Sequence, residues 1–307
     1  MSDSPAPVPP RTAEEEFEAV RPRLFGLAYR MTASVADAED ICQDAWLRWQ
    51  RVDHTGVRSA EAYLVTLTTR LAMDRLRSAH RRREAYVGPW LPEPIPAHAV
   101  PATGSDGPEA RAELADSLTF GFLTLLDELS PVERAVLLLH DVFGHGFTDT
   151  AAAVGISPEA ARKAASRARA KVRRPGDSVS TATAADRDAA TRERLGELTT
   201  ALLTGDADAV LTLLAPGVVQ LDDGGPARRA ARRPVVGPER VTRLLLNVTK
   251  RLVATGPEAE AVDVNGGPGI LMRVGGRATG VMTIALDADG LIDRIWVQLN
   301  PDKLEHL

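Results

Sequence analysis

Apolar residues recur every three to four positions over residues 14–51, which is the period of amphipathic helices. Residues 52–60 interrupt that pattern and are expected to form a loop. The helical period resumes at residue 61 and continues to about residue 83, where the chain becomes strongly basic. We therefore predict an all-helical domain over residues 13–86.

Two segments without apolar periodicity divide the rest of the chain. Residues 87–108 contain nine glycines and prolines, which break helices and strands, and are predicted to be a linker. Helical periodicity returns over residues 109–174, and residues 175–185 form a second linker. Residues 1–12, rich in proline and serine, are expected to be a disordered tail.

The character of the chain changes over residues 186–307. Helices are predicted from about residue 187 to 214 and from residue 238 to about 253. Apolar runs separated by glycine turns then predict four strands, at residues 259–264, 269–274, 278–286 and 291–299. The pattern indicates an α+β domain that ends in an antiparallel meander.

The chain is mildly acidic overall, but its positive charges are concentrated in two segments. The formal net charge of −5 argues weakly against nucleic-acid binding. Residues 70–83, however, hold six arginines against one aspartate, and residues 157–174 hold seven lysines and arginines against one glutamate. Two such stretches can bind phosphates, although each could also be a solvated helix face.

The composition also limits the compartment. The single cysteine, Cys42, excludes an internal disulfide framework. No stretch approaches the ~18 apolar residues that a membrane-spanning helix needs, and the first residues lack the apolar core of a secretory signal. We expect a cytoplasmic protein with no membrane partner.

Residues 147–172 carry the most informative pattern. A short helix, a turn at Gly155 and a second helix that opens with Ser157-Pro158 are expected. Small residues fall on one face of the second helix and basic residues elsewhere. This pattern describes a helix-turn-helix, whose second helix enters the major groove of DNA. An ordinary helical hairpin with a glycine turn is the alternative.

Residues 34–49 predict an acidic helix that also carries Trp46 and Trp49. A face of this kind commonly covers a core and is solvated on its outer side, but it could also dock on a basic partner. Residues 63–84 predict one helix that is apolar in its first half and basic toward its end.

In combination these segments resemble the extracytoplasmic-function sigma factors of bacterial RNA polymerase. The resemblance covers residues 14–84 and 109–174, through the segments ADAEDICQDAWLRW, RLAMDRLRSAHRRRE, LSPVERAVLLLHDVFG and VGISPEAARKAASRARAKV. It implies that the first domain is sigma region 2, which grips the polymerase clamp and melts the −10 promoter element. The second domain would be sigma region 4, which reads the −35 element.

The resemblance implies roles for residues of region 2. Five residues would face the polymerase clamp: Asp37, Glu39, Asp40, Gln43 and Trp46. Five arginines would lie near promoter phosphates: Arg75, Arg77, Arg81, Arg82 and Arg83. The loop over residues 51–59 would capture an unstacked −10 base, with His54, Thr55 and Arg58 as candidates.

In region 4 the resemblance implies two sets of DNA contacts. The candidates for base edges are Glu159, Arg162, Lys163, Ser166 and Arg167, because arginine can bond guanine and glutamate can accept from cytosine. Arg169, Arg173 and Arg174 would touch phosphates, which position the helix without reading sequence, or they form a solvated helix end. The implied partners are core RNA polymerase, double-stranded promoter DNA and its melted single strand.

Two short motifs narrow the resemblance to the subgroup that carries a SnoaL-like C-terminal domain. They are GPWLPEP at residues 88–94 and NPDKL at residues 300–304. The expected fold is therefore multidomain: an all-α region 2, an all-α helix-turn-helix region 4 and an α+β NTF2-like cone of helices against a curved antiparallel sheet. The usual Asp-Gly-Gly-Gly-Lys of the subgroup stands here as Asp223-Gly224-Gly225-Pro226-Ala227, so that loop has lost its lysine charge.

The subgroup motifs imply a regulatory interdomain site. Its candidate residues are Trp90, Leu91, Pro92, Glu93, Pro94, Asp223, Gly224, Gly225, Asn300, Pro301, Asp302, Lys303 and Leu304. Four prolines stiffen the linker around Trp90, and burial of this side chain against the cone would fix the relative positions of regions 2 and 4.

A catalytic function for the C-terminal domain is not expected. Residues 186–305 contain no histidine, cysteine or tyrosine that could titrate near neutral pH. Asp222, Asp223, Asp263 and Asp293 remain as carboxylates, and the first two precede a glycine turn that predicts exposure. We predict no catalytic residue, metal or cofactor, while an unknown small ligand could occupy the cone.

Two other function classes remain open at this point. One is a one-component helix-turn-helix regulator with a small-molecule-binding NTF2-like domain, and the other is an enzyme fused to a DNA-binding module. The acidic segment around residues 37–46 separates the sigma factor from the regulator, because a repressor needs no polymerase-clamp contact.

Overall fold

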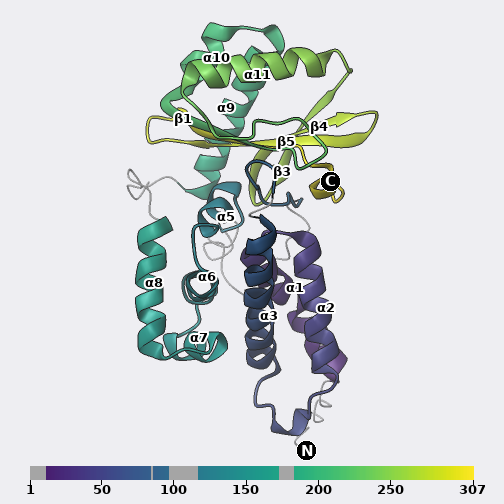
Figure 1. Cartoon of the computed structure of the whole chain (residues 1–307), viewed down its shortest axis with the longest axis vertical. Helices are drawn as coiled ribbons and strands as arrows, with labels where there is room; N and C mark the ends of the chain where they lie inside the picture. Colours follow the sequence, from purple (N-terminus) through teal and green to yellow (C-terminus); the bar gives the residue numbers. More distant parts are fainter. Residues whose placement is uncertain (1–11, 84–85, 97–116, 173–182) are drawn as a thin grey trace, which may run out of the picture.

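The computed structural model describes residues 12–83, 86–96, 117–172 and 183–307. Three parts follow one another: the N-terminal bundle (12–83), the middle helices (117–172) and the C-terminal domain (183–307). Residues 86–96, which we call the crossing segment, leave the N-terminal bundle and lie against the C-terminal domain (Figure 1).

The N-terminal bundle consists of three long helices and a 3₁₀ turn. They are α1 Ala13–Thr32, α2 Val35–Trp49, η1 His54–Gly56 and α3 Ala60–Arg83. α1 begins at a capping box between Thr12 and Glu15, and α2 begins at Ser34, whose hydroxyl accepts from the backbone N–H of Asp37. These helices and the loop before α3 match the sequence prediction.

The middle helices form a short stack that ends in a helix-turn-helix. Their elements are α5 Phe120–Leu126, α6 Pro131–Leu137, the π-helical η3 Leu138–Val142, α7 Phe147–Val154 and α8 Pro158–Val172. Gly155 closes α7 at a φ of 80°, which favours glycine, and this turn directs the chain into α8. The predicted helix-turn-helix is present at the expected residues.

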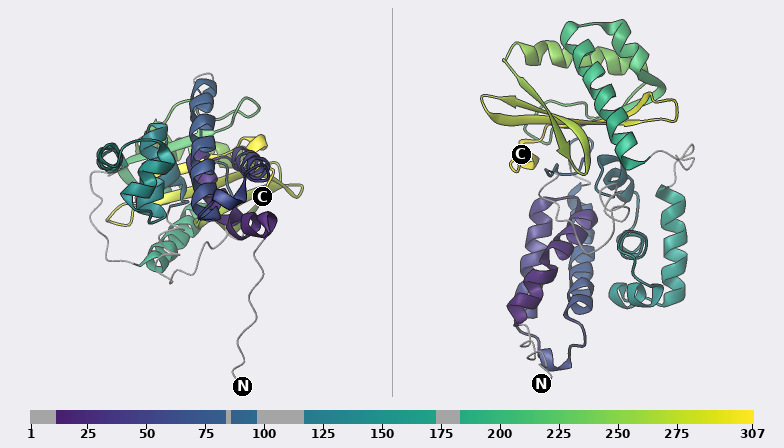
Figure 2. Two further views of the ribbon diagram at one scale, coloured as in Figure 1. Left: turned by 90° about the horizontal axis from the view of Figure 1, so that it is seen from below. Right: turned by 180° about the vertical axis from the view of Figure 1, so that it is seen from behind.

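The C-terminal domain packs helices on one face of a six-stranded sheet (Figures 1 and 2). The helices on that face are α9 Ala184–Thr204, α10 Ala207–Leu213 and α11 Pro238–Val253, while the 3₁₀ turn η4 Pro301–Lys303 lies on the face toward the N-terminal bundle. The strands are β1 Leu214–Asp223, β2 Val235–Val236, β3 Glu258–Val264, β4 Gly267–Val274, β5 Arg277–Leu286 and β6 Ile292–Gln298. Their order in the sheet is β2-β1-β6-β5-β4-β3.

The sheet corrects one part of the prediction. β3 to β6 form the expected antiparallel meander, but the sequence pattern gave no strand between residues 214 and 223. β1 occupies that stretch and pairs with β6 in parallel, so the sheet is mixed rather than wholly antiparallel. Pro216 and Gly217 at the start of β1 explain the omission, because both residues weaken a strand pattern.

Two large cores hold the molecule together. One is shared by the N-terminal bundle and the middle helices, with Tyr29, Trp49, Leu64, Leu126 and Leu138 all buried in it. In α8 it takes in Ala161, Ala164, Ala165 and Ala168, the small-residue face that the sequence predicted. The other lies between the sheet and its helices and includes Leu198, Val241 and Ile295.

The predicted fold class is confirmed: two all-α parts precede an α+β domain built on a sheet. Among the described residues, no helix combines the length and the apolar character needed to cross a membrane.

Candidate interdomain site and nucleic-acid interface

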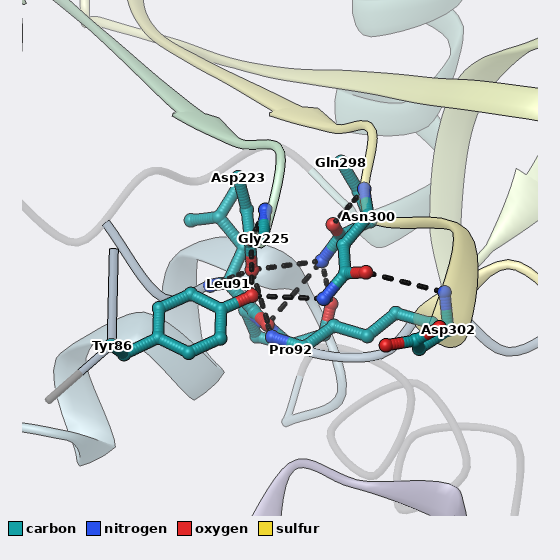
Figure 3. A network of polar contacts seen from close by, with 9 residues as sticks. Tyr86, Leu91, Pro92, Asp223, Gly225, Gln298, Asn300 and Asp302 are labelled. Carbon is teal, nitrogen blue, oxygen red and sulfur yellow. Dashed lines mark hydrogen bonds and ion pairs between the residues drawn. The ribbon is translucent and has the colours of Figure 1, made fainter. Parts of the chain in front are cut away.

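The crossing segment lies at the junction of all three parts. Leu91 is fully buried, and Pro92, Glu93, Pro94 and Ile95 are buried beside it. Figure 3 shows the polar contacts at its first half, where the ends of β1 and β6 meet the segment. Because β1 and β6 are parallel and Asp223 is paired with Gln298, both side chains reach this face of the sheet together.

Asp223 is the centre of the junction. Its carboxylate, wholly buried, accepts hydrogen bonds from the backbone N–H of Leu91 at 2.9 Å and from the hydroxyl of Tyr86 at 2.6 Å. It also accepts from the backbone N–H of Gly225 at 3.0 Å. Burial, followed by the bond to this carboxylate, raises the pKa of Tyr86 above its ordinary value, which keeps the phenol a donor.

Lys303 supplies the positive charge at this junction. Its Nζ lies 2.7 Å from Asp223 Oδ2 and 2.6 Å from the carbonyl oxygen of Leu91. The same Nζ lies 3.9 Å from the ring centroid of Trp90. The side chain of Lys303 is 11% exposed, so the ion pair is a buried one and depends on all of its partners.

The neighbouring residues complete the polar cluster. Gln298 donates to the carbonyl oxygen of Pro92 at 3.1 Å, and Asn300 donates to the hydroxyl of Tyr86 at 2.9 Å. Gly225 has a φ of 55°, and a β-carbon there would stand 2.6 Å from the side chain of Asn300. This position therefore requires glycine both for its backbone and for its close approach.

The second half of the crossing segment is bound to the N-terminal bundle. The carboxylate of Glu93 accepts from the backbone N–H of Val35 at the start of α2, and the N–H of Glu93 donates to the carbonyl of Ala33 at 3.0 Å. Glu93 therefore faces the bundle and not the cluster around Asp223. Its carboxylate at a helix N-terminus is favoured by the exposed N–H groups there.

Asn265 joins the same stretch to the C-terminal domain. Its side chain accepts from the backbone N–H of Ile95 at 3.0 Å and donates to the hydroxyl of Tyr29 at 2.6 Å. Tyr29 belongs to α1 and is fully buried. The crossing segment is thus held between the bundle on one side and the sheet on the other.

The middle helices reach the junction through an apolar cluster. Leu91, Phe120 of α5 and Trp296 of β6 pack together and are at most 3% exposed. Leu304 lies in a separate buried cluster with Val264, and Pro301 opens η4. Gly224 packs against the carbonyl of Arg228. Together with the polar cluster around Asp223, these contacts place most of the predicted interdomain residues at the junction.

The predicted exposure of Asp222 and Asp223 is wrong. Asp222 is 5% exposed and Asp223 is 0% exposed. The glycine turn that follows them is folded back onto the domain, with the backbone N–H of Arg228 donating to the carbonyl of Gly224 at 3.0 Å. The strand β1 also continues to Asp223, so both residues belong to the sheet and not to a surface loop.

The N-terminal bundle and the middle helices also contact each other directly. Arg134, almost fully buried, donates to the carbonyl of Met31 at 2.6 Å. Arg70 donates to the carbonyls of Ala152 and Ala153 at the end of α7. Burial lowers the pKa of Arg30 to about 10, and its guanidinium donates to Ser117 at 2.8 Å. The two helical parts are therefore in a closed arrangement.

The outer face of α8 is open to solvent. Glu159, Arg162, Lys163, Ser166, Arg167 and Arg169 are all exposed. Arg167 and Lys171 pair with the buried carboxylate of Glu133, which forms the capping box of α6 with Ser130. Burial alone raises the pKa of Glu133, but bonds from Lys171, Ser130 and Arg167 outweigh it and lower the pKa to about 2. Arg162 keeps its guanidinium near the ring of Phe147, 5.6 Å from the centroid.

The acidic face of α2 and the basic helix α3 are joined by an ion pair. Arg75 lies 2.7 Å from Asp37 and 2.5 Å from Asp40. Asp37 is the less exposed of the two carboxylates, while Glu39 pairs with Arg21 across the bundle surface. Gln43 is exposed, and Trp46 packs on Phe17 with ring centroids 5.0 Å apart. Arg75, which was predicted to bind promoter phosphates, therefore forms ion pairs with two residues that were predicted to face the polymerase.

The loop before α3 lies at the pole of the bundle opposite the C-terminal domain (Figure 1). The ring of His54 meets Trp49 edge-on with centroids 4.3 Å apart. Asp53 accepts from the backbone N–H and the hydroxyl of Thr55, and Arg58 and Arg77 are exposed. The side chains of Arg81, Arg82 and Arg83, and all of Arg173 and Arg174, lie outside the described residues.

Family models match the two helical parts. Sigma-70 region 2 matches residues 17–82, and Sigma-70 region 4 matches residues 120–172. Over 94% of its length the chain is 39% identical to the ECF RNA polymerase sigma factor SigJ of Mycobacterium tuberculosis, of which it covers 92%.

The chain belongs to the extracytoplasmic-function RNA polymerase sigma factors.

Other likenesses agree with this family. The chain is 31% identical over 95% of its length to the probable ECF sigma factor SigI of Mycobacterium tuberculosis, of which it covers 94%. It also resembles the crystal structure of SigJ, with a TM-score of 0.70, 35% identity, and coverage of 94% of this chain and 96% of that one. The SigJ match spans the C-terminal domain as well as the helical regions, so this sigma factor shares the whole architecture with that structure.

Several residues of the junction were not found by sequence reasoning. Tyr86, Gln298, Asn265 and Tyr29 all bond within it. Gln298 was the most accessible to prediction, because an amide inside an apolar strand must find partners when it is buried. Tyr29 and Asn265 were not predictable from local sequence patterns, because their contact joins two residues that lie far apart in the chain. No group of three or more histidine, cysteine, aspartate or glutamate side chains able to hold a metal occurs among the described residues.

Proposed function

We propose that this sigma factor binds core RNA polymerase through the acidic face of α2 and directs initiation at promoters read by α8. The observation that carries this proposal is that an exposed recognition helix and an acidic helix with exposed Glu39 and Asp40 occur in one chain. Core polymerase and promoter DNA, double-stranded at the −35 element and melted at the −10 element, are the partners. The C-terminal domain regulates this activity through the crossing segment.

The regulatory part of the proposal follows from distance. The −35 and −10 elements are named by their positions relative to the transcription start, so they lie about 25 base pairs apart. That separation is roughly 80 Å of duplex at about 3.4 Å per base pair. Region 2 and region 4 in the closed arrangement share one core and cannot span that length. Engagement of both elements therefore requires the two regions to separate, and any contact that favours the closed arrangement lowers output.

The C-terminal domain contributes such contacts. It binds the crossing segment through Asp223 and Lys303, region 2 through Asn265, and α5 of region 4 through Trp296. A domain that holds both regions and the segment between them stabilises the closed arrangement over the separated one. We propose no reaction and no ligand for it.

The test of the proposal is assembly with core polymerase followed by run-off transcription. The wild-type chain should co-purify with core and direct initiation at its promoter. Asp40→Lys should weaken core association about tenfold or more, which is roughly 1.4 kcal/mol. The melting temperature should barely move, because Asp40 is 61% exposed and its ion pair is worth about 0–1 kcal/mol.

The matched control is Glu18→Lys, which reverses an exposed charge on α1 of the same bundle. It should leave core association unchanged. A chain that neither binds core nor starts transcripts would refute the sigma-factor mechanism, and a large loss of melting temperature in Asp40→Lys would place that carboxylate in a structural role.

Promoter reading by α8 has its own expected result. Arg162→Ala should cost ~1–3 kcal/mol of promoter affinity and relax the preference at one base pair, because an arginine fork contacts one guanine. Arg169→Ala is the control and should weaken binding to every sequence alike, since it acts on phosphates. Affinities measured on a set of single-base promoter variants distinguish a base contact by Arg162 from a phosphate contact by Arg169. An equal loss on all sequences from Arg162→Ala would contradict its role as a reader.

A further inference from the structure

The loop between β1 and β2 carries a dense positive charge that the proposed mechanism does not use. Arg228, Arg229, Arg232 and Arg233 fall within six residues and are all exposed. No acidic residue occurs between positions 224 and 238. None of the four side chains makes an ion pair with another described residue. We call residues 228–233 the arginine loop.

The backbone of the arginine loop is hydrogen-bonded to residues at the end of β1 and just after it. The N–H of Arg228 donates to the carbonyl of Gly224 at 3.0 Å, and the N–H of Ala231 donates to the carboxylate of Asp222 at 3.4 Å. Gln220 donates to the same carboxylate at 2.7 Å. The buried carboxylate of Asp222, which Gln220 also binds, therefore holds the loop backbone while the four arginines are exposed. A loop anchored in this way presents its charges without a large ordering cost.

The arginine loop contacts the crossing segment, which follows the basic end of α3 in the sequence. A β-carbon on Gly88 would lie 3.4 Å from the Cα of Arg232, so the crossing segment and the loop are in contact. Gly88 follows the last residue of α3 by five positions, which an extended chain spans in at most about 18 Å. α3 rises toward the C-terminal domain at this point and carries the exposed Arg77 (Figure 1). The loop therefore lies within reach of the C-terminal end of α3, whose sequence is basic.

We propose that the arginine loop binds the phosphate backbone of promoter DNA next to region 2. This inference rests on the proposed function, because it requires the chain to approach promoter DNA. Four guanidinium groups within six residues repel one another, and a polyanion relieves that repulsion. The planar guanidinium fork matches phosphate oxygens in pairs. An acidic surface of the polymerase is the competing partner, but the short chain distance to the basic end of α3 favours DNA.

Phosphate contact predicts a change in salt dependence. The slope of log affinity against log salt concentration falls by about 0.9 for each phosphate contact that is lost on duplex DNA. The test variant carries four substitutions, Arg228→Gln, Arg229→Gln, Arg232→Gln and Arg233→Gln. Its holoenzyme should bind a promoter fragment with a slope smaller by about 2–4 and roughly tenfold or more weaker near physiological salt. Assembly with core should be unchanged.

The control removes the same charge from the far side of the domain. α11 lies on the face of the sheet away from the N-terminal bundle (Figure 1) and carries four exposed cations. The control variant therefore carries Arg240→Gln, Arg243→Gln, Lys250→Gln and Arg251→Gln, and its slope should match that of the wild type. Circular dichroism and melting of both variants establish that each remains folded.

Three outcomes would overturn the inference. They are an unchanged slope in the arginine-loop variant, an equal fall in both variants, and a loss confined to core assembly, which would make the polymerase the partner. Failure of the wild-type holoenzyme to bind the promoter at all would instead refute the proposed function, so the two failures are distinguishable.

Discussion

Replacing Asp223 with asparagine should lower the free energy of unfolding by about 3–5 kcal/mol, because it leaves the charge of Lys303 buried without its partner. The side chain of Lys303 is 11% exposed and the carboxylate of Asp223 is 0% exposed. The asparagine also cannot accept in place of both oxygens from Leu91 and Tyr86. Denaturant unfolding of the full chain measures the loss.

Two further variants separate the buried charge from general damage. Lys303→Met in the Asp223→Asn background removes the uncompensated charge and should restore part of the lost stability. Asp263→Asn is the matched control, because Asp263 pairs with Arg192 at 2.6 Å but both side chains are 50% exposed. It should cost at most about 1 kcal/mol. A loss in Asp223→Asn no larger than in this control would show that the junction is not a stabilising centre.

Replacing Trp90 with alanine should raise promoter-specific transcription severalfold. Trp90 covers the ammonium group of Lys303, and a cation over an indole contributes about 0.5–2 kcal/mol. Loss of that contact weakens the hold of the C-terminal domain on the crossing segment and shifts the population toward separated regions. A shift of about 1.4 kcal/mol changes such an equilibrium tenfold. Run-off transcription at limiting sigma factor measures the change.

The control for Trp90→Ala is Val248→Ala, which shortens an exposed apolar side chain on α11. It should leave output at the wild-type level. Unchanged or lower output from Trp90→Ala, in a chain that remains folded, would contradict the restraint that we propose for the C-terminal domain.

Local signals in the sequence predicted much of the fold. The helix-turn-helix was predictable because Gly155, Ser157 and the alanine face of α8 act within one short segment. The strands of the meander were predictable because glycine turns separate them. Motifs named Asp223, Asn300 and Lys303 among the candidate junction residues, and the structure places these three together.

Non-local pairing accounts for what the sequence did not predict. β1 is a strand largely because β6 pairs with it, and that partner lies about 70 positions away in the chain. The burial of Asp222 and Asp223 follows from that pairing, whereas their glycine-rich sequence predicts a surface turn. The positive charge beside Asp223 comes from Lys303, 80 positions further along the chain.

The distance between region 2 and region 4 in the free chain tests the central claim most directly. Spin labels at Arg48→Cys on α2 and Ala170→Cys on α8 report it, since both positions are exposed. The native Cys42 should stay unlabelled, because burial raises the pKa of its thiol to about 12. The account predicts one narrow distance distribution in the full chain and a broader, longer one with Asp223→Asn, while Asp263→Asn leaves it narrow. The same narrow distribution in all three chains would contradict it.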